Sequence, residues 1–156
     1  MKQVILFLSL ALACGLLFTN IYNSMIDAKS WGTDIPGSIE TAREYFKAVN
    51  PGNFFRIFSP NNQVLALVAL VLFWKSSLSV RIYLGITLVL YVLSELFTFS
   101  YFYPRNDIMF KNSLTDIDAI RKAWTGWNSM NRLRSFILFA GIIFSFMALH
   151  KTYTSK

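Results

Sequence analysis

The stretch Val64-Leu-Ala-Leu-Val-Ala-Leu-Val-Leu-Phe-Trp74 decides the fold class, because it is an unbroken run of eleven apolar residues. Extended to residues 60–77, it predicts a helix about 27 Å long, close to the thickness of the hydrocarbon core of a bilayer. Ser59 and Pro60 are typical of a helix start, with serine as the N-cap and proline at the first helical position.

Three further apolar blocks predict helices over about residues 3–25, 80–103 and 116–150. In the first block the apolar run continues past Cys14, so we expect an uncleaved helix rather than a lipoprotein signal. The other two blocks have recognisable limits. Pro104 is expected to end the third helix, and Thr115 with Asp118 forms a capping-box pattern before the fourth.

The loop between the first two helices contains a shorter pattern. Ile39, Ala42, Phe46 and Val49 recur at helical spacing, and Asn50 and Pro51 follow them. This spacing predicts an amphipathic helix over about residues 39–49 that lies on the bilayer surface or covers the bundle. The expected fold is therefore all-α, a polytopic four-helix transmembrane bundle formed by residues 1–156 as a single domain, with one extra helix in the first long loop.

Composition supports this class. The chain is 54% hydrophobic and only 15% charged, against about 25% charged in soluble domains. With one cysteine and one histidine, the chain cannot form an internal disulfide, and a structural zinc site is not expected. The net charge of +7 does not predict nucleic-acid binding, because the basic residues flank apolar blocks and form no long basic run. Cofactor and phosphate-loop fingerprints are missing from the sequence as well.

The basic residues predict the orientation. The short terminal and linking segments contain basic residues and no acidic ones, namely Lys2, Lys75, Arg81, Lys151 and Lys156. The two long loops mix basic with acidic residues. By the positive-inside rule both termini are expected in the cytoplasm and the long loops outside, in the cell (inner) membrane.

Polar side chains gather in the predicted outer half of every helix. They include Asn20, Asn62, Thr98, Tyr101, Asn128 and Asn131. Such groups avoid lipid, so they are expected to converge inside the bundle. Two interpretations remain open: hydrogen bonds that join the helices, or an outward-opening polar pocket.

Glu95 is the only acidic residue in the third apolar block, and Arg134 precedes the apolar run of the fourth. A carboxylate at that depth is neutral, paired or solvated by a cavity. Arg134 is the expected partner, with Arg132 or Arg56 as substitutes. Glu95 is then either half of a structural ion pair or a proton acceptor. Trp127, Asn131 and Arg134 are spaced to share one helix face, so Trp127 is either an interfacial belt residue or part of a pocket.

The segment from Thr98 to Asp107, followed by Trp127 to Arg134, resembles the anthrone-oxygenase-like family of small four-helix membrane proteins. Members tend to show proline-x-asparagine after the third helix, then a tryptophan, then asparagine or histidine and arginine leading into the fourth. Pro104, Asn106, Trp127, Asn131 and Arg134 occupy those places here.

This resemblance implies oxidation of a polycyclic phenolic carbon acid by dioxygen, without metal or flavin. Glu95 and Arg134 would be the base and the anion-stabilising group. Independently of the resemblance, the polar pocket is expected to take a small lipophilic molecule and to be lined by Asn20, Asn62, Tyr101, Asn106, Trp127 and Asn131. The alternative is a non-enzymatic membrane protein whose outer loops dock a partner, and a transporter subunit is disfavoured because no pair of broken helices is apparent.

Overall fold

The computed structural model describes residues 2–154, and helices joined by short turns make up this part of the chain, with no β-strand. Lys156, used above to predict orientation, lies outside the described residues. The elements in chain order are α1 (Lys2–Tyr22), η1 (Asn23–Asp27), α2 (Ala28–Trp31), α3 (Gly37–Tyr45), α4 (Pro51–Leu72), α5 (Leu78–Phe97), η2 (Thr98–Phe102), α6 (Tyr103–Phe110) and α7 (Ile117–Thr154).

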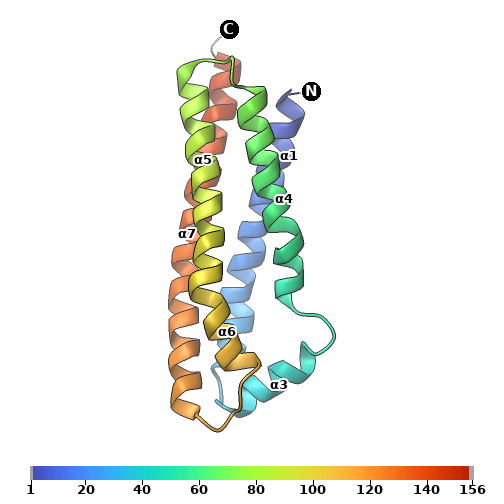
Figure 1. Ribbon diagram of the computed structural model, residues 1–156, viewed down its shortest axis with the longest axis vertical. Coiled ribbons are helices and arrows are strands. Elements are labelled where there is room, and N and C mark those ends of the chain that lie inside the picture. Colours follow the sequence, from blue (N-terminus) through green and yellow to red (C-terminus); the bar gives the residue numbers. More distant parts are fainter. Residues whose placement is uncertain (1, 155–156) are drawn as a thin grey trace.

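Four continuous helical rods form an elongated bundle (Figure 1). They are Lys2–Trp31, Pro51–Leu72, Leu78–Phe110 and Ile117–Thr154, and each is long and apolar enough to cross a membrane. In the bundle α5 packs on α7, and α1 packs on both α4 and α7. Both termini lie at one end, here called the terminal end, beside the turn that joins α4 to α5. The helices α3 and α6 lie at the opposite end, here called the loop end (Figure 1).

Two groups of buried apolar side chains hold these rods together. The larger group packs α1, α4, α5 and α7, and includes the small residues Ala13, Ala66 and Ala69. Small side chains let helix backbones approach closely. The second group lies at the loop end and includes Trp31, Ile39, Phe102, Met109, Ile120 and Trp127. It packs α2 and α6 against α7, and α3 against α2 and α6.

The predicted start of the second long helix is wrong. Helix α4 begins at Pro51, nine residues before Pro60, and Pro60 lies inside it. Pro51, and not Pro60, takes the first-turn position, where the missing N–H of proline costs little. Residues 51–63 therefore form a helical wall at the loop end, where the sequence had predicted a loop as far as Ser59.

The predicted end of the third helix is also wrong, because the rod passes through Pro104. Before the proline the hydrogen bonding shifts to π geometry, and the N–H of Tyr103 donates to the carbonyl of Thr98. Pro104 then falls in the first turn of α6. A proline at that position interrupts no bond of the new helix. A similar π segment, η1, carries the first rod beyond Tyr22 to Trp31.

Two smaller expectations need correction. Helix α3 covers Gly37–Tyr45, so it begins two residues earlier and ends four residues earlier than the predicted range of 39–49. At the start of α7 the cap is Asp116, because its carboxylate accepts a hydrogen bond from the N–H of Ala119 at 2.9 Å. Thr115, the predicted cap, is instead hydrogen bonded to Ser113.

Candidate functional site

A cavity of about 560 Å³ occupies the loop-end half of the bundle. It is bounded by all four rods, with α3 near its opening. Its lining changes in character along the bundle. The apolar floor, toward the terminal end, is formed by Leu16, Tyr91 and Leu138, and a polar layer follows with Asn20, Asn62, Glu95, Thr98 and Arg134. Nearer the loop end are aromatic side chains, and then basic ones.

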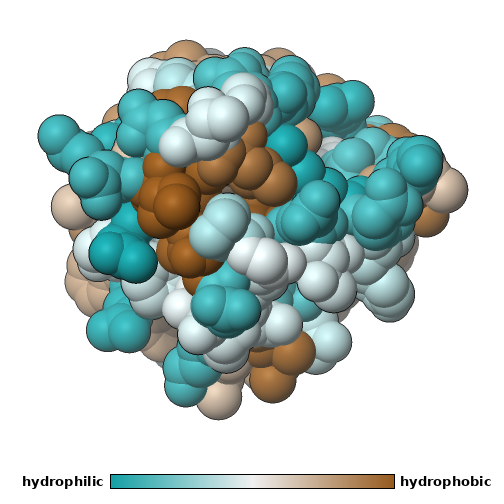
Figure 2. Space-filling view, turned by 90° about the horizontal axis from the view of Figure 1, so that it is seen from below, coloured by the Kyte–Doolittle hydropathy of each residue, from teal (hydrophilic) through white to brown (hydrophobic). Residues whose placement is uncertain are grey.

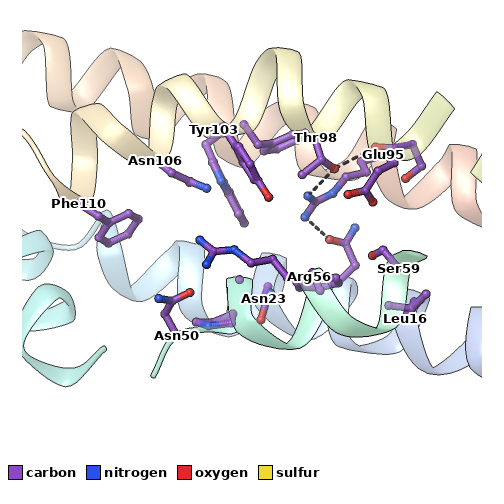
Figure 3. Close-up of a pocket in the computed structure, with 18 of the residues that line it drawn as sticks. Leu16, Asn23, Asn50, Arg56, Ser59, Glu95, Thr98, Tyr103, Asn106 and Phe110 are labelled. Carbon is purple, nitrogen blue, oxygen red and sulfur yellow. Dashed lines mark hydrogen bonds between the residues drawn. The ribbon is translucent and has the colours of Figure 1, made fainter. Parts of the chain in front are cut away.

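Arg134 organises the polar layer. It is buried on α7, and its guanidinium donates hydrogen bonds to Asn20 Oδ1 on α1 and to Thr98 Oγ1 on η2 (Figure 3). The same guanidinium lies 4.3 Å from the centre of the Phe102 ring. Asn20 in turn donates to Ser135 Oγ at 2.7 Å. Three rods are therefore joined by one cation, whose position is determined by several contacts.

Glu95 lies on α5, half-buried in the same layer, on the side of Thr98 and Ser59 (Figure 3). The predicted ion pair between Glu95 and Arg134 does not form. Within residues 2–154 the ion pairs are Lys47 with Glu44 and Lys111 with Asp107, and both are exposed. Glu95 thus lines the same cavity as Arg134 without a direct ion pair between them.

Aromatic rings line the next part of the cavity. Trp127 is buried, with its ring centre 5.2 Å from that of Trp31 and 5.6 Å from that of Phe102. Both pairs meet edge to face, a favoured arrangement that keeps the rings in place. Three residues that line the cavity have a buried polar atom without a hydrogen-bond partner among the described residues, namely Asn62 Oδ1, Tyr91 Oη and Trp127 Nε1. Such atoms are rare, because burying them unpaired costs free energy.

Six of the eight residues proposed from the sequence line this one cavity. They are Asn20, Asn62, Glu95, Asn106, Trp127 and Arg134. They come from four different rods, which is why the sequence alone does not reveal their proximity. The structure brings the two charged candidates and four of the six pocket candidates together.

Asn131 and Tyr101 are the two that do not line the cavity. Asn131 is fully buried and donates to the carbonyl of Asn20 at 3.2 Å and to Ser24 Oγ. It therefore joins α7 to the first rod, as expected of an interhelical amide. Tyr101 is not among the lining residues, and the Arg105 guanidinium stacks on its ring at 3.4 Å from the centre.

The sequence interpretation missed several lining residues, chiefly Trp31, Phe55, Phe102 and Phe110, and gave Arg56 only as a substitute partner for Glu95. A signal was present for the wall formed by α4. Phe55, Arg56, Ser59, Asn62 and Gln63 follow helical spacing along one face. That face becomes apparent only when the helix starts at Pro51, before the misleading Pro60.

The described residues contain no group of three or more His, Cys, Asp or Glu side chains that could hold a metal ion. Comparison of the chain with protein-family models, curated proteins and solved structures found no match.

Proposed function

We propose that this chain is an integral membrane protein that crosses the cell membrane four times. Its four long apolar helices support this proposal. So do large apolar side chains on the outer surface, such as Phe18 and Phe136, which are 72% and 66% exposed. A surface of this kind is unfavourable in water and favourable in lipid. The basic residues of the terminal end support an orientation with both termini in the cytoplasm and the loop end outside.

For a membrane protein in this orientation, the function best supported is the binding of a small lipophilic molecule in the loop-end cavity. The observation that carries it is the cavity itself, whose volume of about 560 Å³ lies in the range of sites for small molecules. Aromatic walls suit an apolar ligand, and the polar layer of Glu95 and Arg134 supplies a few directional groups. The rods Lys2–Trp31, Leu78–Phe110 and Ile117–Thr154 have 30, 33 and 38 residues, more than the ~20 needed to span the hydrocarbon. Their loop-end parts, and with them the mouth of the cavity, then reach the outer interface.

The reaction suggested by the family resemblance fits this layer. The Glu95 carboxylate would take a proton from the methylene carbon of a polycyclic phenol, and Arg134 would stabilise the resulting anion. The carbanion reduces dioxygen and forms a carbon–oxygen bond, giving a hydroperoxide. Loss of water from the hydroperoxide leaves a carbonyl, so that methylene plus O₂ becomes carbonyl plus H₂O. The favouring observation is that Glu95 and Arg134 line one cavity without forming an ion pair with each other.

The competing function is a structural or partner-docking protein, in which the polar groups only join helices. Asn131 behaves in this way, since its hydrogen bonds go to α1 and η1. The two functions give Glu95 different roles. In the binding function its carboxylate acts on the ligand, and in the docking function it would only join helices. Glu95 forms no ion pair with another helix.

Thermal unfolding of the detergent-purified protein tests the proposal, with a panel of lipophilic phenols, quinones and sterols added to wild type and to Glu95→Gln. Glu44→Gln is the matched control, because it removes the same charge from an exposed side chain outside the cavity. We expect at least one compound to raise the melting temperature of wild type and of Glu44→Gln. Glu95→Gln should respond less, and oxygen uptake with that compound should be lost in it.

If no compound stabilises any of the three folded proteins, the binding function is wrong and partner docking is favoured. Stabilisation without oxygen uptake would retain binding and exclude the oxygenase step for the compounds tested.

A further inference from the structure

The charges that line the cavity are unbalanced. Five basic side chains line it, Arg43, Lys47, Arg56, Lys111 and Arg134, against the acidic Glu95 and Asp107. At the loop end hydrophilic residues surround an apolar cluster (Figure 2). An excess of positive charge in a partly enclosed site attracts anions, since low-dielectric walls strengthen and focus the field.

Most of these basic groups already have partners. Lys111 pairs with Asp107 at 2.7 Å, and Lys47 pairs with Glu44 at 3.5 Å. Arg43 donates to the carbonyls of Met109 and Asn112, at 2.9 and 2.7 Å, and thereby ties α3 to the end of α6. Arg134 is held in the polar layer by its contacts with Asn20 and Thr98.

Arg56 differs from the others. Among the described residues it has neither a hydrogen bond nor an ion pair through its side chain. It lines the cavity from α4 as an exposed side chain, with its guanidinium directed toward the loop end, on the side of Asn50 and Asn106 (Figure 3). A guanidinium presents a fixed fork of N–H donors that matches a carboxylate or a phosphate.

The aromatic lining is adjacent to this cation. Phe55 precedes Arg56 on the same helix, and Phe102, Phe110 and Trp127 line the cavity with them. One molecule could place an apolar body among these rings and an anionic group on Arg56. A free anion would use only the cation, and a neutral lipophile would use only the rings.

We infer that the cavity takes an anionic amphiphile, a lipophilic body bearing a carboxylate or a phosphate that pairs with Arg56. This inference rests on the proposed binding function and adds the charge class of the ligand to it. The anion lies toward the mouth and the aqueous interface, where its hydration is partly kept, and the body lies among the aromatic side chains.

Binding to the purified full-length protein in neutral-lipid nanodiscs tests this, with pairs of probes that differ in the anionic group. Anthracene-9-carboxylate is compared with 9-anthracenemethanol, and oleoyl lysophosphatidic acid with mono-oleoylglycerol. We expect each anion to bind more tightly than its neutral partner. Arg56→Gln should weaken anion binding about tenfold or more and leave neutral binding nearly unchanged.

Arg132→Gln is the matched control, because it removes the same charge from an exposed site on α7 outside the cavity. Arg132→Gln should leave the preference for the anionic probes intact. Arg56→Lys should retain part of the preference that Arg56→Gln removes. Competition by inorganic phosphate alone separates a free-anion site from an amphiphile site, so displacement of the probes by phosphate at comparable concentration would overturn the inference.

Equal affinity for anionic and neutral members of both pairs, unaffected by Arg56→Gln, would also overturn the inference while leaving the proposed binding function in place. Binding of neither member of either pair would contradict both.

Discussion

Arg134 is the residue on which the polar layer depends. Its guanidinium donates to Asn20 Oδ1 and Thr98 Oγ1, and both Arg134 and Asn20 are buried. Replacing it with methionine would keep much of the side-chain volume and leave Asn20 Oδ1 without its donor. A buried acceptor left unpaired costs about 1–3 kcal/mol. We therefore expect Arg134→Met to lower the melting temperature in detergent clearly, and Arg134→Lys to lower it less, because lysine keeps the charge and loses the planar fork.

Arg132→Met is the control for Arg134→Met, because Arg132 is exposed and lies two residues away on the same helix. It should leave the melting temperature nearly unchanged. Equal melting temperatures for the Arg132 and Arg134 methionine variants would mean that the network adds nothing to stability.

At the scale of elements, α5 and α7 are held close together at Gly141. A Cβ added there would lie 2.6 Å from Tyr91 Cε1, and the buried Thr87 hydroxyl donates to the Gly141 carbonyl at 3.2 Å. Gly141→Ala should push the two helices apart and destabilise the bundle by about 1–3 kcal/mol, as overpacking does. Gly85→Ala on α5, with nothing within 4 Å of the added Cβ, should be neutral or stabilise by up to ~1 kcal/mol. Thermal unfolding of the two variants in one detergent measures the difference, and an equal effect would rule out the close approach.

The existence of the long helices could be predicted from the sequence, but not all of their boundaries. Four long helices follow from the apolar blocks, because only a helix or a closed barrel satisfies the backbone inside lipid. The boundary at Pro104 could not be predicted, because the proline rule assumes α-type bonding on both sides and η2 replaces it with π bonding. The start at Pro60 was wrong because proline favours the first turn of a helix, and here Pro51 takes that place while α4 continues past Pro60. Arg56 was undervalued for the same reason, whereas Asn131 was overvalued because a helix face does not reveal whether a neighbouring helix or a cavity covers it.

At the scale of the whole molecule, charge is distributed between the two ends of the bundle. The basic residues Lys2, Lys75, Arg81 and Lys151 lie toward the terminal end, and every acidic residue except Glu95 lies in the loops or the loop-end segments of the rods. The positive-inside rule then predicts that the loop end, with the mouth of the cavity, faces outward. A cavity that opens outward can exchange its ligand with the outer leaflet or with the aqueous side.

Single cysteines test this orientation in a Cys14→Ala background, because Cys14 is the only cysteine in the chain. Ser113→Cys lies in the loop between α6 and α7, and Ser77→Cys lies in the turn between α4 and α5; both positions are exposed. A membrane-impermeant maleimide added to intact cells should label Ser113→Cys at once, and should label Ser77→Cys only after permeabilisation. The reverse pattern would mean that the cavity opens toward the cytoplasm. An anionic ligand would then have to come from the inner leaflet. Labelling of both positions in intact cells would contradict a four-span topology, since four crossings place these two segments on opposite sides of the membrane.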